Sequence, residues 1–205
     1  VCHIPNIKDL LNSVKKLLSK EGVFIFEEPY LGSVFKKTSY DQIYDEHIFM
    51  FSVSSVKKIF NLFDFELIDV LPQITHGGSM RYVIARKGEY KIKKIVKKNL
   101  LYESRKNINS LKGCLRFKKE CENSKKKLNN RINSILKKGK NIAGYAATSK
   151  STTILNYCGI DSKKIDFICD TTKNKIGKYT PRTHIPIKNM DYFRKNIPDY
   201  TFLFA

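Results

Sequence analysis

The stretch from residue 7 to residue 27 constrains the fold more than any other part of the sequence. Apolar side chains recur at helical spacing over residues 7–20, and Glu21 and Gly22 then interrupt the pattern. Val23 to Glu27 form a short run of β-formers that is typical of a buried strand. Helix, glycine and buried strand make half of a doubly wound unit, so the sequence predicts an α/β fold in which this strand is parallel to its neighbours.

The rest of the first part alternates in the same way. Residues 32–51 are expected to form an aromatic-rich loop, and Ser52 or Ser54 should cap a short helix that follows. Residues 65–71 and 80–85 are strand-like, and Gly77-Gly78 lies between them. The pattern therefore predicts a hairpin after the short helix.

The remaining residues fall into two parts. Residues 90–138 are rich in lysine with partial helical periodicity, which indicates a connecting helix or a helical pair. A second α/β region follows, with strands expected at 141–147, 165–169 and 201–204 and a helix at 149–157. The sequence thus predicts two α/β parts joined by a helical connector.

Charge and cysteine content exclude several classes of protein. The net charge of +20 comes mostly from scattered lysine, and arginine, the residue that reads bases, is scarce, so we do not expect a nucleic-acid-binding protein. The 5 cysteines form no Cys-x-x-Cys pair, so neither a disulfide framework nor a metal site is expected, and a cytoplasmic location fits. No apolar run reaches about 18 residues, so membrane insertion is not expected. A first residue other than Met and an apolar end suggest a fragment of a longer protein.

The segment from Tyr40 to His47 concentrates carboxylates, phenols and an imidazole directly after the predicted strand. His47 is suited to proton transfer because an imidazole titrates near neutral pH, and Glu46 could orient it. Tyr44 could donate a hydrogen bond to a developing oxyanion. The alternative is a polar surface loop with a solvent-facing histidine. Taken singly, His3 and His76 are expected to be structural or solvent-exposed.

Two further segments could hold a ligand. Gly78, Ser79 and Arg81 combine a backbone that a ligand can approach with a guanidinium that binds phosphate or carboxylate, although an ordinary hairpin turn explains them equally well. Residues 144–150 lie between a predicted strand and a predicted helix, where free amides favour an anion such as phosphate. Asp170, at the end of the next strand, could accept from a ligand hydroxyl or cap its own turn.

Together these segments resemble the S-adenosylmethionine (SAM)-dependent sugar C-methyltransferases that act on nucleotide-linked keto-deoxysugars. The resemblance covers essentially the whole chain and rests on four ordered motifs: Tyr44-Asp-Glu-His47, Thr75-His-Gly-Gly-Ser-Met-Arg81, Gly144-Tyr to Lys150 with Leu155-Asn-Tyr-Cys-Gly159, and Asp170 followed by Gly177-Lys-Tyr-Thr-Pro and Ile185-Pro. Two segments depart from the family pattern. The loop after Gly144-Tyr usually has more glycine and a Pro, where this chain has Ala146, Ala147, Thr148 and Ser151, and Arg182 replaces a glycine expected after Pro181.

The resemblance implies a fold class and domain boundaries. Residues 1–88 would be the C-terminal part of a class I, Rossmann-like SAM methyltransferase domain, 89–139 a helical connector, and 140–205 a truncated Rossmann-like α/β domain that binds the sugar nucleotide. The glycine-rich SAM loop and a zinc-binding N-terminal domain would lie upstream of Val1. This chain would then hold no SAM-binding residues that its sequence reveals, no metal, and too little of the enzyme to be active alone.

The resemblance also implies a mechanism and its residues. His47 would remove the proton from C-3 of a 4-keto sugar and the resulting enolate would attack the SAM methyl group, while Tyr44, Glu46 and His3 complete the catalytic group. The substrate-binding residues would be Gly78, Ser79, Arg81, Gly144, Tyr145, Ser149, Lys150 and Asp170. The alternatives are methyl transfer to a hydroxyl or to a non-sugar substrate, and a non-catalytic nucleotide- or nucleic-acid-binding module.

Overall fold

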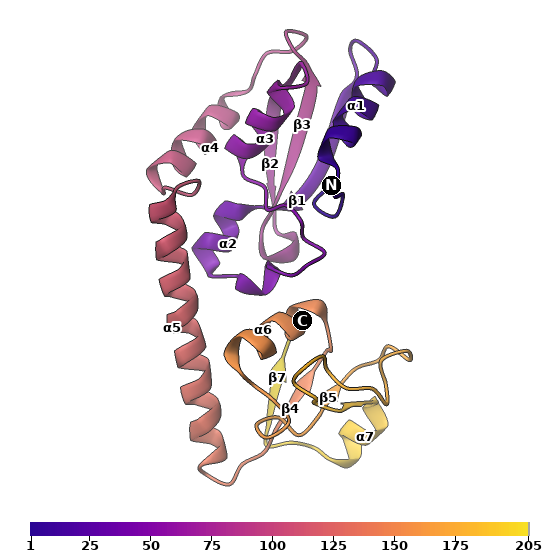
Figure 1. Cartoon of the computed structure of the whole chain (residues 1–205), viewed down its shortest axis with the longest axis vertical. Coiled ribbons are helices and arrows are strands. Elements are labelled where there is room, and N and C mark those ends of the chain that lie inside the picture. The colour runs from indigo at the N-terminus through magenta and orange to yellow at the C-terminus, as the bar shows by residue number, and fades with distance from the viewer. Residues whose placement is uncertain (205) are drawn as a thin grey trace. The chain divides into compact units, whose positions relative to one another are not determined.

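The computed structural model describes residues 1–204 and divides into two compact units. The first unit comprises residues 1–39 and 45–118, and the second comprises residues 40–44 and those from 119 onward. Two helices fall in the expected connector, α4 (Lys94–Arg105) and α5 (Leu111–Leu136) (Figure 1). α5 begins in the first unit and ends in the second, so it is a shared element of both.

The sheet of the first unit contains β1 (Val23–Pro29), β2 (Phe65–Gln73) and β3 (Ser79–Arg86) in the order β1-β3-β2. β3 is antiparallel to both neighbours, which confirms the predicted hairpin. The expectation that residues 23–27 form a buried parallel strand is wrong in direction, because β1 is antiparallel to β3, and it is confirmed only in part for burial, because Phe26 is buried. β1 is an edge strand among the described residues, and Val23 and Ile25 are 41% and 51% exposed. The apolar run covers both faces of the strand, so its hydrophobicity did not reveal which face is packed.

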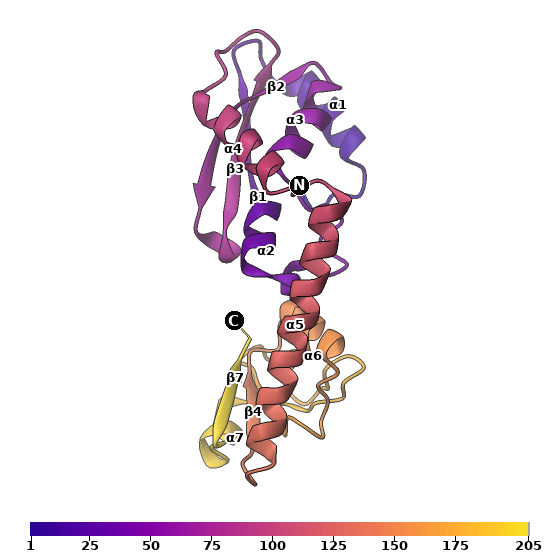
Figure 2. The same cartoon turned by 90° about the vertical axis from the view of Figure 1, so that its left-hand side faces the viewer.

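Two helices lie on one side of this sheet, α1 (Ile7–Leu17) and α3 (Val53–Asn61) (Figure 2). The Asn6 side chain caps α1 by accepting from the backbone N–H of Asp9. Ser52 caps α3 and forms a reciprocal capping box with Ser55, which satisfies amides that the helix itself leaves unpaired. The predicted cap of α3 is therefore confirmed, whereas the Asn6 cap of α1 was not predicted.

Residues 32–51 are more ordered than the loop that their sequence predicts. They include most of α2 (Leu31–Lys37) and the short 3-10 helix η1 (Tyr40–Gln42). The segment starts and ends side by side, because Tyr30 pairs with Phe51 in an isolated β-bridge and the Leu31 amide donates to the Phe51 carbonyl at 2.8 Å. Residues 31–50 thus form a long segment, called the excursion below, whose two ends are hydrogen-bonded to each other. This excursion carries His47.

A buried carboxylate fixes the base of the excursion. Glu103, on α4, is 2% exposed and accepts from the Tyr30 hydroxyl at 3.0 Å and from the Val53 and Ser54 amides at 2.6 and 2.9 Å. The Ser54 hydroxyl adds a fourth bond at 2.5 Å. A negative charge at the N-terminus of α3 also complements the helix dipole. Burial, followed by the charge of Glu103, raises the pKa of Tyr30 and keeps its phenol in the donor form.

The second unit contains a parallel sheet, as the sequence predicts for an α/β region. β4 (Ile142–Tyr145), β5 (Ile168–Cys169), β6 (Ile187–Lys188) and β7 (Tyr200–Leu203) have the order β6-β5-β4-β7, and all three pairings are parallel. α6 (Ser149–Cys158) follows β4, and α7 (Met190–Lys195) precedes β7. The mixed α/β class is thereby confirmed. β6 and α7 were not predicted, and β5 is shorter than the predicted strand at 165–169.

The 3-10 helix η1 packs on α6 and joins residues 40–44 to the second unit. The ring of Tyr40 lies 5.0 Å from that of Tyr157, and its hydroxyl is 3.5 Å from the Cys158 sulfur. A hydrophobic cluster of this unit includes Ile160, Ile165 and Ile185, which are fully buried. None of the helices formed by residues 1–204 combines the length and the apolar character that a membrane span needs.

Each of the two segments that depart from the family pattern contains a residue with left-handed backbone. Ala146 has a φ of 72° and Arg182 a φ of 64°, a region that a residue with a Cβ occupies at a cost of about 1–2 kcal/mol. Arg182→Gly should therefore raise the stability of the second unit by about 0.5–1 kcal/mol, since part of the relief is lost to the flexibility of glycine in the unfolded chain. Urea unfolding measures the change. Arg182→Ala is the matched control, because it removes the same side chain but retains a Cβ. Equal stabilisation by both variants would show that φ is not the cause.

Candidate active site and substrate pocket

The N-terminal segment is bound to the end of β1 and to the residues that follow His47. The main-chain nitrogens of Val1 and Cys2 lie 2.5 and 2.9 Å from Oε1 of Glu28, near the C-terminal end of β1. The Cys2 carbonyl accepts from the amides of Ile48 and Phe49 at 3.0 and 3.4 Å. These bonds draw together two segments that are far apart in the sequence.

As a result, two predicted catalytic residues, His3 and His47, lie side by side. Their ring centroids are 5.1 Å apart and their planes are inclined by 67° in an edge-to-face arrangement. His3 is exposed and His47 is partly buried. An imidazole that is held on one side and open to solvent on the other can reach a bound substrate. The sequence alone favoured a structural or exposed role for His3, and it is the proximity of His47 that gives this exposed residue functional interest.

The other two predicted catalytic residues lie on the same segment as His47. Glu46 is exposed and belongs with His47 to the first unit, whereas Tyr44 is partly buried and belongs to the second. The boundary between the units thus falls within the Tyr44-Asp-Glu-His47 motif. The roles of Tyr44 and Glu46 remain predictions.

Cys2 is a residue of this cluster that the sequence did not single out. Its sulfur lies within 4.8 Å of a ring nitrogen of His3 and of a ring nitrogen of His47, and those two nitrogens also lie within 4.8 Å of each other. Burial, followed by a hydrogen bond with Glu28, raises the pKa of the Cys2 thiol to about 12, so the free thiol is protonated near neutral pH and is a poor nucleophile. The sequence feature that could have drawn attention to Cys2 is its position next to His3.

Glu28 remains ionised despite its burial. Burial alone would raise the pKa of this carboxyl, but hydrogen bonds from Cys2 and from the Val1 nitrogen outweigh that effect and lower the pKa. The carboxylate therefore holds the Cys2–His3 segment on the sheet.

Gly78 lies in the predicted hairpin turn, and Ser79 and Arg81 lie at the start of β3. Gly78 has a φ of 127°, and a Cβ there would lie 2.5 Å from the Ser33 hydroxyl, so only glycine fits. Arg81 is bound to Glu27 at 3.0 Å, and the hydroxyl of buried Ser79 donates to the Thr75 carbonyl at 3.0 Å. A hydrogen bond from Thr75, followed by one from Arg81, lowers the pKa of Glu27. These contacts are those of the turn alternative, and substrate binding by Gly78, Ser79 and Arg81 stays a prediction.

The second unit has a hollow of about 300 Å³ at the start of α6. Thr148 caps this helix by accepting from the Ser151 amide at 3.1 Å. Of the predicted substrate-binding residues, Ser149 lines the hollow, while Gly144 and Tyr145 form the end of β4 and Lys150 lies in the first turn of α6. The lining residues are Ala147, Thr148, Ser149, Ser151, Thr152, Asn174, Lys175, Lys178, Tyr179, Thr180, Pro181 and Ile187. Lys175, Lys178 and Tyr179 were not predicted individually, although two of them lie in the Gly177-Lys-Tyr-Thr-Pro motif.

Asp170 is buried and is bonded to the loop before α6 rather than open to solvent. It is 7% exposed and accepts from the amides of Ala147 and Thr172, each at 2.7 Å. Burial alone would raise the pKa of this carboxyl, but the bonds from Thr172 and Ala147 and the charge of Lys175 outweigh it and lower the pKa. The turn-capping alternative that the sequence left open is therefore present, and a contact with substrate stays a prediction.

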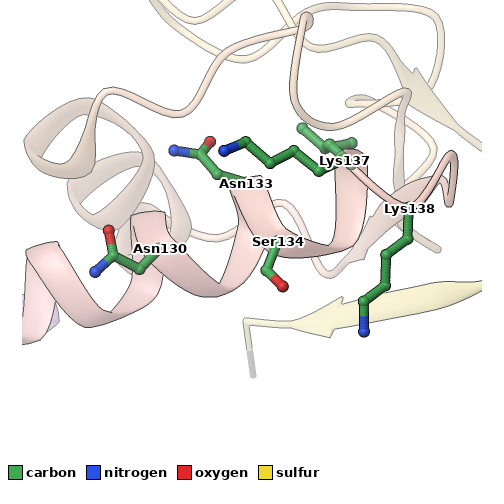
Figure 3. A pocket seen from close by; sticks show the side chains of 6 residues that line it. Asn130, Asn133, Ser134, Lys137 and Lys138 are labelled. Atoms are coloured by element: carbon green, nitrogen blue, oxygen red, sulfur yellow. The ribbon is translucent and has the colours of Figure 1, made fainter.

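A second hollow in this unit does not coincide with any predicted site. It has a volume of about 610 Å³ and is lined by Leu136 and by polar residues of α5 and the turn after it. Figure 3 shows the side chains of Asn130, Asn133, Ser134, Lys137 and Lys138 around it. Neither a carboxylate nor an imidazole is among the lining residues, so we assign the hollow no role in proton transfer.

Comparisons with known proteins establish the family to which these two units belong. The profile described as the C-methyltransferase C-terminal domain matches residues 74–205, and a methyltransferase domain profile matches residues 1–70. The chain belongs to the C-methyltransferase family. This confirms the resemblance inferred from the four motifs, and the alternation of helices and strands is that of a Rossmann-like methyltransferase fold.

A curated relative supports the same conclusion. The chain is 31% identical over 204 residues to the C-methyltransferase NovU of Streptomyces niveus. The alignment covers 99% of this chain and 49% of that protein, so the chain spans about half the length of the curated relative.

Proposed function

We propose that this chain is part of an enzyme that transfers a methyl group from SAM to carbon 3 of a nucleotide-linked 4-keto-deoxysugar, with His47 as the base. The observation that carries the proposal is the His3–His47 pair, with ring centroids 5.1 Å apart, held near the C-terminal end of β1 in a chain of the C-methyltransferase family. In this proposal residues 1–88 belong to the SAM-dependent domain and residues 140–205 bind the sugar nucleotide.

The chemistry requires a base and a means of stabilising negative charge. A proton next to a ketone is acidic enough for an imidazole to remove once the enolate oxygen is stabilised. His47 would take that proton, and Tyr44 would donate a hydrogen bond to the oxygen. His3 would help to orient the sugar or His47, because it is exposed beside the partly buried ring. SAM supplies the methyl group that the enolate carbon attacks.

The second unit offers a place for the nucleotide. A hollow of about 300 Å³ at the N-terminus of α6 is lined by Lys175 and Lys178, and Tyr179 provides an aromatic face. Positive side chains together with the helix dipole favour a diphosphate. Lys175 is also bound to the Ala147 carbonyl at 2.7 Å, which holds it at the rim of the helix start. We therefore assign the diphosphate to this hollow, where Lys178 and the helix N-terminus accompany Lys175, which also lies 3.7 Å from Asp170.

The proposal is tested with this chain joined to the cofactor-binding region that the family resemblance places ahead of it. Incubation with a nucleotide-linked 4-keto-deoxysugar in heavy water, without SAM, should introduce deuterium at carbon 3, as measured by mass spectrometry and NMR. In water with SAM, a substrate already deuterated at carbon 3 should lose that label when it is methylated. A methylated product that retains the label would refute attack from carbon 3 and would support methyl transfer to a hydroxyl.

A further inference from the structure

We propose that Cys2, His3 and His47 form a binding site for a divalent metal ion of borderline softness, of which Zn²⁺ is the best match. The three potential ligand atoms, one sulfur and two imidazole nitrogens, all lie within 4.8 Å of one another. Neither the sequence motifs nor the relatives assign a metal to these residues, and a site made from two adjacent residues and a distant histidine has no simple sequence signature.

The donor set selects the kind of ion. Thiolate and imidazole ligands suit Zn²⁺ and related transition metals, whereas Mg²⁺ and Ca²⁺ require oxygen ligands. Cys2 would bind the ion as a thiolate, and the proton of its thiol would be released to solvent as the metal–sulfur bond forms. In a tetrahedral zinc site with Zn–N and Zn–S bonds of about 2.0 and 2.3 Å, neighbouring ligand atoms are about 3.3–3.7 Å apart. Separations of up to 4.8 Å therefore close around an ion when the side chains move by about 1 Å.

The surroundings favour a bound cation. The main chain of Cys2 is already fixed by Ile48, Phe49 and Glu28, so two of the three ligands lie on segments that are bonded to each other before an ion arrives. The Glu28 carboxyl group, which accepts from the Cys2 amide at 2.9 Å, places an acidic side chain next to the cluster. The exposure of His3 provides an entry path and leaves room for a fourth ligand such as water.

Metal binding at this cluster would oppose the proposed chemistry. A metal ion occupies the same imidazole lone pair that His47 would use to remove a proton, so the two uses of that nitrogen exclude each other. Zinc should therefore inhibit proton abstraction at carbon 3. This consequence rests on the proposed function, whereas the binding site itself does not.

Binding is measured on this chain with a histidine- and cysteine-free extension before Val1, because a free amino group two residues before His3 is itself a metal ligand. Equilibrium dialysis should show about one tightly bound Zn²⁺ per chain, and titration with Co²⁺ should give visible bands of tetrahedral cobalt and a sulfur-to-cobalt charge-transfer band. His3→Ala, which changes an exposed side chain and leaves the core untouched, should weaken binding by roughly 10–100-fold or more while the sulfur band persists. Cys2→Ser should abolish the sulfur band.

Two variants provide matched controls. Cys114→Ser and His184→Asn change an exposed cysteine and an exposed histidine outside the cluster, and both should bind Zn²⁺ as the parent chain does. The proposal is overturned if the parent chain binds no stoichiometric Zn²⁺, if His3→Ala binds it as tightly as the parent, or if the cobalt spectrum shows no sulfur band. Because none of these readouts requires methyl transfer, they remain valid if the proposed enzymatic function fails.

Discussion

Replacing His47 with alanine is expected to lower the rate of carbon-3 proton exchange, and with it methyl transfer, by about 10²–10⁴-fold. The expectation follows from the position of the residue. His47 is partly buried next to His3, and its main chain is fixed because the following amides of Ile48 and Phe49 donate to Cys2. Removal of the imidazole deletes the base without disturbing these backbone bonds.

The measurement compares exchange rates for the parent enzyme and the variant in heavy water, together with their affinities for SAM. SAM binding should not change, since the substitution acts on proton transfer alone. His184→Asn provides a control for the loss of an imidazole elsewhere in the chain, and it should retain full exchange. Exchange by His47→Ala at the parental rate would remove His47 as the base and would direct attention to His3.

The local signals in the sequence predicted more than the topology did. Asn6 was not singled out, but the helical stripe that follows it was, and Ser52 caps α3 as expected. Such caps are local because a side chain bonds to an amide three residues away. The antiparallel pairing of β1 could not be read in the same way. A short apolar run does not reveal the direction of its neighbour, and β1 is paired with β3, the second strand of the hairpin.

In the candidate site, too, the sequence predicted local features but not the contacts between distant segments. The sequence identified His47 from the chemistry of its neighbours, but His3 gained its interest only from a contact between distant segments, through the Cys2 carbonyl and the amides of Ile48 and Phe49. Main-chain bonds of this kind leave no pattern in residue type. Cys2 was overlooked for the same reason, because a search for paired cysteines does not find one sulfur that joins two imidazoles in space.

The residues that adopt left-handed backbone are an instructive intermediate case. Arg182 stands where the family resemblance suggests glycine, Ala146 lies in a loop that is usually richer in glycine, and both have positive φ in the structure. The family pattern therefore pointed to the two segments that hold these residues, but it did not predict their backbone conformation. The physical reason is that the turn requires left-handed backbone whichever residue occupies it, and a residue with a Cβ then has a steric clash that glycine avoids.

Glu103→Ala should cause the largest loss of stability, about 3–5 kcal/mol in the first unit. Besides a long hydrogen bond from the exposed Asn109 side chain at 3.4 Å, the substitution removes the acceptor for four groups, namely the Tyr30 hydroxyl, the Val53 and Ser54 amides, and the Ser54 hydroxyl. Each of these donors is buried or partly buried, so water replaces the lost carboxylate poorly. Glu103→Gln retains one acceptor oxygen and should cost less, about 1–3 kcal/mol.

Urea unfolding gives the overall change in stability, and hydrogen exchange of peptides that cover α3 identifies the unit that opens. Glu120→Ala is the control, because Glu120 is an exposed residue of α5 and its loss should change stability by less than about 0.5 kcal/mol. If Glu103→Ala unfolds at the same urea concentration as Glu120→Ala, the buried network does not carry the stability assigned to it.

The same network links stability to the proposed chemistry. Glu103 bonds to Tyr30 on one side and to Val53 and Ser54 on the other, and these residues flank the excursion that carries His47. Without the hydrogen bonds of Glu103 the two ends of the excursion should separate more easily, and His47 should then leave its position beside His3. Glu103→Gln should therefore reduce carbon-3 exchange at a temperature where the protein is still folded, whereas Glu120→Ala should not. An unchanged exchange rate in a destabilised Glu103→Gln protein would show that the excursion holds His47 in place without this carboxylate.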